Sequence, residues 1–192
     1  MRAALFAFAL IATTVVQAQQ GPTERAIELA MSDETAQVRY IDDTEFGGQG
    51  NNELSYALFL SEERDVVGSA GVLIPSNLNL GEFEIRFGPQ AYAALLSEEN
   101  NDVFALAFGL DARLNLARNR GLAVVGSAYW SPDVLTFGSA DNLRDFMARA
   151  ELQLTNQLLG FGGYRWFELD LLERQERGLQ NEIFIGVRWQ LR

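Results

Sequence analysis

Segments in which apolar side chains alternate with small, polar or charged ones occupy most of this chain. A period of two places the two kinds of side chain on opposite faces of a β-strand. The sequence therefore predicts an all-β, antiparallel protein whose strands each have one apolar face. From residue 52 onward, eight segments show the pattern: Glu53–Ser61, Val66–Ile74, Glu82–Tyr92, Val103–Leu114, Leu122–Trp130, Arg144–Leu154, Leu158–Leu169 and Glu182–Leu191.

Two further alternating segments, Ala26–Met31 and Thr35–Ile41, lie upstream around a turn at residues 32–34. Counting them raises the expected number of strands from eight to ten, and both even numbers suit a single-chain barrel. The first segment also fits a helical stripe, so a short helix that begins at Pro22 is the alternative there. A bulge is expected at Pro89, because proline cannot donate to the hydrogen-bond ladder of a closed sheet.

The amino terminus has the features of a secretory signal peptide. Met1 and Arg2 give a positive start, residues 3–16 are mostly apolar, and Val16-Gln17-Ala18 is a small-residue cleavage pattern. The apolar stretch is shorter than the roughly 20 residues that a membrane-spanning helix needs. The expected division is a signal peptide over residues 1–18, an N-terminal segment over 19–51 made of short strands or a periplasmic segment, and a barrel over 52–192.

The strand faces and the predicted export together favour a transmembrane β-barrel of eight to ten strands. In the last segment Ile183, Ile185 and Val187 share one face, and Glu182 and Arg188 share the other. Strands of about 9–11 residues suit tilted membrane strands. A soluble periplasmic barrel that binds an apolar ligand would alternate as well, but with its bulky apolar face inward. The sequence alone does not orient the faces.

Loop lengths suggest how such a barrel would be placed in the membrane. With the carboxyl terminus in the periplasm, the long connections Ser131–Asn142 and Asp170–Asn181 lie outside. The tight turns Thr155–Gln157 and Arg118–Gly121 then lie inside, as single-chain bacterial barrels prefer.

The composition excludes several function classes. The chain has no His and no Cys, so it lacks the commonest general base, a thiol nucleophile and thiolate zinc sites. Its 15 basic residues are all Arg and are outnumbered by 26 acidic ones, which leaves no basic surface for nucleic acid. No acidic cluster has the spacing of a calcium loop. We therefore expect no enzymatic activity, no cofactor, no metal site and no nucleic-acid partner.

Charged residues that share the small-residue face are the candidate site, because in a narrow barrel they would point into the lumen. Arginines opposite carboxylates would form either a polar pore for small ions or a network that fills the lumen. The mixed signs on one face favour the network, since paired charges satisfy each other's hydrogen bonds in a confined space. The candidates are Glu82, Glu84, Arg86, Asp111, Arg113, Arg149, Glu151, Glu182 and Arg188.

Several stretches of the predicted barrel carry recognisable motifs: Val67–Gly71, Ala128–Phe137, Arg149–Leu152, Gly162–Arg165 and Asn181–Trp189. Together they resemble the YfaZ family of outer-membrane proteins, and the resemblance covers most of residues 52–192. It implies an outer-membrane β-barrel of a Gram-negative bacterium and implies no activity. The ending Gly186-x-x-Trp189-x-Leu191 also resembles the signal read by the barrel-assembly machinery, although Arg192 follows in place of a terminal aromatic residue.

The function expected from these observations is a non-enzymatic envelope role: structural, surface-interaction or narrow channel. The expected partners are outer-membrane lipid and lipopolysaccharide, with the assembly machinery during insertion, and the barrel is expected to be a monomer. One alternative is a membrane-embedded enzyme that modifies lipid or lipopolysaccharide through carboxylates at one rim. The other is the soluble ligand-binding barrel described above.

Overall fold

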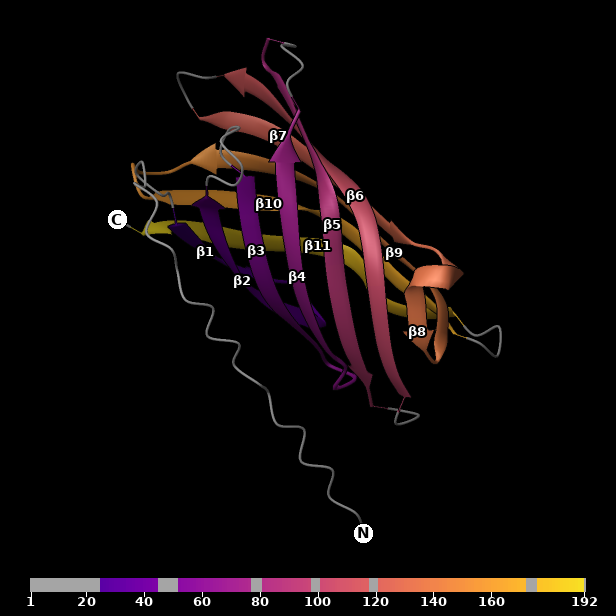
Figure 1. The fold of residues 1–192 in the computed structure, drawn as a ribbon. Coiled ribbons are helices and arrows are strands. Elements are labelled where there is room, and N and C mark those ends of the chain that lie inside the picture. The colour runs from indigo at the N-terminus through magenta and orange to yellow at the C-terminus, as the bar shows by residue number, and fades with distance from the viewer. Residues whose placement is uncertain are drawn as a thin grey trace.

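The computed structural model describes residues 25–44, 52–76, 81–97, 101–117, 121–171 and 176–191, which form a closed antiparallel β-barrel (Figure 1). The predicted signal peptide at residues 1–18 lies outside the described residues. The elements are β1 (Arg25–Met31), β2 (Thr35–Thr44), β3 (Asn52–Ser61), β4 (Val66–Pro75), β5 (Phe83–Leu96), β6 (Asn101–Ala117), β7 (Leu122–Ser131), the 3-10 turn η2 (Asp133–Leu135), β8 (Thr136–Gly138), β9 (Ala140–Gln153), β10 (Leu158–Leu171) and β11 (Glu176–Leu191).

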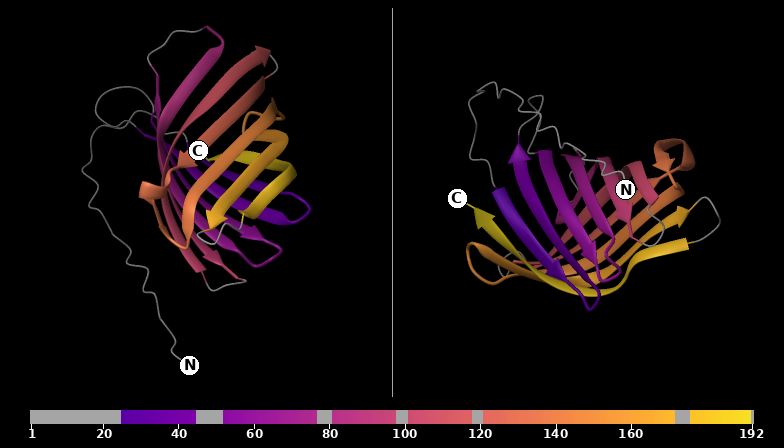
Figure 2. Two further views of the ribbon diagram at one scale, coloured as in Figure 1. Left: turned by 90° about the vertical axis from the view of Figure 1, so that its right-hand side faces the viewer. Right: turned by 90° about the horizontal axis from the view of Figure 1, so that it is seen from below.

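Ten strands close the barrel among the described residues, which confirms the larger of the two predicted numbers. They follow the order β5-β4-β3-β2-β1-β11-β10-β9-β7-β6, and pairing of β5 with β6 completes the circle. The short β8 adds to the β6 edge at residues 103–105. Figure 2 shows from two further sides how the strands surround the lumen. No helix in the described part of the chain is long and apolar enough to cross a membrane.

The first two strands belong to the barrel wall. β1 pairs along its whole length with β2 on one side and with β11 on the other. The alternative of a helix through Met31 is therefore wrong, because the ladder on both sides satisfies the backbone groups of this segment. The expected boundary at residue 52 also does not separate two structural units, since residues 25–44 complete the same sheet.

Most of the large apolar side chains face outward, apart from a group inside the barrel toward one end. Ile183, Ile185 and Trp189 on β11 are 73%, 64% and 59% exposed, whereas Phe184 between them is buried. The same alternation runs around the barrel, with Leu29, Leu58, Phe87 and other apolar residues on the outside. This orientation is opposite to the one that a soluble barrel with an apolar interior requires.

The barrel has two ends that differ in their connections. The terminal end holds Arg25 and Leu191 and the last residues of β2, β4, β6 and β9. The opposite end holds the last residues of β1, β3, β5 and β10 and the segment with η2 and β8. At the opposite end Asp170–Asn181 is not the long loop that was predicted. β10 and β11 continue through most of it, because their ladder resumes beyond a bulge at Phe167/Glu168.

The expected bulge at Pro89 is not present. Pro89 pairs in register with Phe108 of β6, and the pairs Gly71↔Gln90 and Ile74↔Phe87 keep one register on the β4 side. Only the ladder between these two pairs is interrupted. There the two strands come very close, since a Cβ on Gly88 would lie 1.9 Å from the carbonyl oxygen of Val72. The missing donor is thus accommodated by an interruption on one side of the strand, without an extra residue.

Candidate functional site: the barrel lumen

Five charged side chains from four strands form the centre of the lumen, and we call them the central cluster: Glu28, Arg113, Arg149, Glu151 and Arg188. Nη2 of Arg149 lies 3.0 Å from Oε1 of Glu28 and 2.7 Å from Oε1 of Glu151. Nη2 of Arg188 lies 2.5 Å from Oε1 of Glu28, and Nη1 of Arg113 lies 2.5 Å from Oε2 of Glu151. Each carboxylate is thus shared by at least two guanidiniums.

The strand register explains how these residues meet. Glu28 and Arg188 are direct partners across β1 and β11, and Arg149 and Glu151 are two residues apart on the inner face of β9. Between β9 and β11, β10 presents Gly163, where a Cβ would lie 2.7 Å from Cβ of Arg149. The glycine leaves space for Arg149, whose guanidinium also lies 4.6 Å above the ring centroid of Phe161.

A second group of charges lies on the other wall of the barrel. Glu53 of β3 accepts hydrogen bonds from Arg39 of β2 at 3.0 Å and from Arg86 of β5 at 2.8 Å. Asp111 of β6 lies in the same region of the lumen. This group places a carboxylate between two guanidiniums, as in the central cluster.

A third group lies nearer the opposite end. Arg165 donates two hydrogen bonds to Asp145, at 2.8 and 2.7 Å, and a third to Gln37 at 2.7 Å. The hydroxyl of Tyr92 donates to the same carboxylate at 2.9 Å. The guanidinium of Arg165 also lies 4.6 Å from the ring centroid of Phe167. A bidentate ion pair with these additional donors satisfies both buried charges.

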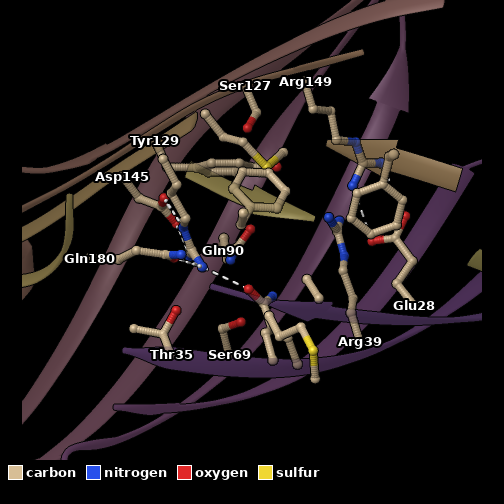
Figure 3. Close-up of a pocket in the computed structure, with 18 residues that line it drawn as sticks. Glu28, Thr35, Arg39, Ser69, Gln90, Ser127, Tyr129, Asp145, Arg149 and Gln180 are labelled. Carbon is tan, nitrogen blue, oxygen red and sulfur yellow. Dashed lines mark hydrogen bonds and ion pairs between the residues drawn. The ribbon is translucent and has the colours of Figure 1, made fainter. Parts of the chain in front are cut away.

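Two cavities remain between these groups. The middle cavity, of about 50 Å³, lies between the central cluster and the Arg165–Asp145 pair; Figure 3 shows Glu28, Arg39 and Arg149 at one side of it and Asp145 and Gln180 at the other. The end cavity, of about 220 Å³, lies on the terminal-end side of the central cluster. Arg39 and Arg149 line both cavities, so their side chains stand at the boundary between the two.

An apolar layer fills the lumen toward the opposite end. It consists of buried side chains from β3, β5, β9, β10 and β11: Phe59, Tyr92, Leu143, Phe167, Leu169 and Leu179. The part of β11 that runs past the bulge is joined to the turn between β3 and β4 by Arg177, whose Nη2 lies 3.0 Å from Oδ2 of Asp65. Asp65 is fully buried and also accepts a hydrogen bond from the backbone N–H of Ser97 at 2.9 Å.

The Arg177–Asp65 contact predicts a local stability effect. Replacing Arg177 with Met leaves the buried Asp65 carboxylate with fewer donors, and we expect a loss of about 1–3 kcal/mol in unfolding free energy. Amide hydrogen exchange should rise first in residues 176–180 and 167–171, because they depend on this contact. Unchanged exchange in these residues would show that the contact does not hold the extension of β10 and β11.

The predicted site residues divide into two sets. Arg86, Asp111, Arg113, Arg149, Glu151 and Arg188 line the end cavity, and Glu84 lies at its rim, where it accepts a hydrogen bond from Asn115. Glu82 is exposed before β5, and Glu182 lies toward the opposite end, where Ser32 donates to it. These two glutamates lie outside the network, because residues of one parity on a strand are spread along the length of the barrel.

Some network residues were not among the predicted candidates, namely Glu28, Arg39, Glu53, Asp145 and Arg165. Their positions in the alternating pattern could have indicated that they face the lumen. Glu28 alternates with Ile27 and Leu29, and Asp145 shares the face of Arg149. Among the described residues, no group of three or more acidic side chains is arranged to hold a metal ion.

Comparisons with known proteins agree with this architecture. The profile of the family described as YfaZ precursor matches residues 25–191, nearly the whole chain. No curated protein matches. Among solved structures, the chain is similar in fold to a bacterial polysaccharide outer membrane secretin, with a TM-score of 0.50 and 10% sequence identity over 90% of this chain and 67% of that chain. At this identity the likeness concerns the fold alone.

Proposed function

The chain belongs to the YfaZ family, and we propose that it is an outer-membrane β-barrel with a non-enzymatic envelope role, whose filled lumen does not form an open pore. The observation that carries the proposal is the division of the side chains. Apolar residues cover the outside of the barrel and buried ion pairs fill its inside. A barrel wall in lipid requires this arrangement, because all backbone groups are paired around a closed sheet and charges are kept from the hydrocarbon.

The outward aromatic residues support a membrane position. Trp130, Tyr164 and Trp189 are about half exposed, and Trp166 stacks on Phe146 with ring centroids 5.4 Å apart. Such residues form the interfacial girdles of outer-membrane barrels. Tyr129 is also an aromatic residue near the end of a strand, but its side chain faces the lumen and so does not belong to a girdle.

The proposed orientation places the terminal end in the periplasm and the opposite end at the cell surface. Both chain ends of the barrel, Arg25 and Leu191, lie at one end, which suits insertion from the periplasm after export. The proposed partners are outer-membrane lipid and lipopolysaccharide around the wall, and the barrel-assembly machinery, which would read the closing strand β11. We propose a monomer, since the apolar outer face is then covered by lipid.

A narrow channel is the second candidate, and the end cavity favours it, because this cavity leaves part of the lumen open to water. The apolar layer at the opposite end and the central cluster argue against a continuous water path. Ions would need to pass the layer around Phe167 and Leu169, which are 1% and 0% exposed.

Planar-bilayer recording of the purified barrel separates the two candidates. We expect no stable open-channel current, because the apolar layer and the shared ion pairs leave no continuous path for water. A sizeable stable current would refute the filled lumen and establish the channel.

Fractionation of cells tests the membrane position. It should recover the chain with outer membranes, with a mature amino terminus near Gln19. Recovery as a freely soluble periplasmic protein would refute the membrane barrel.

A further inference from the structure

The wall of the end cavity presents guanidiniums in front of the carboxylates that neutralise them. The side chains of Arg39, Arg86, Arg113 and Arg188 are 19%, 27%, 26% and 20% exposed. Their carboxylate partners lie deeper: Glu28, Glu53 and Glu151 are 5%, 12% and 0% exposed. Within these ion pairs the guanidiniums are therefore more accessible from the cavity than their carboxylate partners, although Asp43, Glu84 and Asp111 also line it.

The donors in this wall outnumber the acceptors. A guanidinium carries five N–H groups, yet Arg39 and Arg86 each donate one hydrogen bond to a side chain in the described part of the chain, both to Glu53. Nε of Arg149 and Oε1 of Glu151 are both buried without a hydrogen-bond partner.

The charge of the wall is also positive in its deep part. Five arginines, the four named above and Arg149, share three glutamates. Asp111 is the fourth carboxylate there and has no hydrogen-bond or ion-pair partner among the described residues. Nearer the mouth, Arg25 is accompanied by Asp43 and Glu84, so that part of the wall carries one more negative than positive charge. The excess of positive charge is thus located between Arg39, Arg86 and the central cluster.

We propose that the end cavity is a binding site for a small oxyanion, either a free phosphate or the phosphate group of a small metabolite, held by Arg86, Arg113 and Arg39. Planar guanidiniums bind phosphate oxygens through paired N–H donors, and this geometry distinguishes phosphate from chloride. The cavity of about 220 Å³ far exceeds the roughly 10–15 Å³ that one water needs, so an oxyanion fits with part of its hydration. Binding of phosphate in this cavity requires only the folded barrel and does not depend on the membrane location proposed above.

Calorimetric titration of the full barrel in detergent with inorganic phosphate tests the site, with sodium chloride keeping the ionic strength constant. We expect saturable binding that weakens at least tenfold in the Arg86→Gln/Arg113→Gln double variant. This variant leaves Glu53 with Arg39, and Glu151 with Arg149 and Arg188. The matched control is Arg144→Gln, because Arg144 pairs with Asp170 on the outer face at the opposite end and should not affect binding.

Asp111→Asn gives a test of opposite sign. It removes the unpaired carboxylate without breaking an ion pair, so phosphate should bind several-fold more tightly. A parallel titration with glucose 6-phosphate distinguishes the sources: tighter binding than inorganic phosphate identifies a phosphorylated metabolite, and weaker binding identifies the free ion. The proposal is overturned if neither ligand binds saturably at constant ionic strength, or if Asp111→Asn fails to strengthen binding.

Discussion

Arg149→Ala is expected to lower the free energy of unfolding by about 3–5 kcal/mol, because it removes one partner from two buried carboxylates at once. The side chains of Arg149, Glu28 and Glu151 are 5%, 5% and 0% exposed, so water compensates little for the lost contacts. Urea unfolding of the barrel in lipid vesicles, followed by tryptophan fluorescence, measures the change.

Two comparisons make the Arg149 result specific. Arg144→Ala removes an arginine from the same strand, but its side chain is 37% exposed on the outer face, and such pairs contribute about 0–1 kcal/mol. In the Arg149→Ala background, Glu28→Gln should cost less than it does in the unchanged protein, because the carboxylate has already lost one of its two arginines. Additive effects of Arg149→Ala and Glu28→Gln would contradict a shared network.

Ile185→Arg should impair insertion, at a cost of about 2–4 kcal/mol if the position lies near the bilayer midplane. Ile185 is 64% exposed on the outer face of β11, between β1 and β10. Leu106→Arg on β6 is expected to act in the same way. Heat-modifiable mobility on gels, which reports the folded barrel, should be reduced for both variants relative to the unchanged protein.

Asn181→Arg is the matched control for Ile185→Arg. Asn181 lies on the same strand and the same outer face, but beyond the apolar residues and toward the opposite end, where it accepts a hydrogen bond from Tyr164. The cost of a charge falls to about 0–1 kcal/mol near the membrane surface. If both variants fold equally well, the apolar outer face does not lie in lipid.

The sequence by itself determined most of the strands and the two faces of each of them. Alternation is local, because successive side chains of a strand always point to opposite sides. Ile183, Ile185 and Val187 could therefore be separated from Glu182 and Arg188 without knowledge of any partner strand. Residues 26–31 were ambiguous for the same reason, since a short segment fits a helical and a strand period equally well.

Only the tertiary structure decided which face is outside and which charges meet. Glu28 and Arg149 are 121 residues apart, and their contact depends on closure of the sheet between β1 and β11 and on the stagger of β9, β10 and β11. Parity places Glu182 and Arg188 on one face, but their height along the barrel separates them. The end cavity is likewise bounded by six glutamate–arginine contacts between different strands, which no single segment encodes.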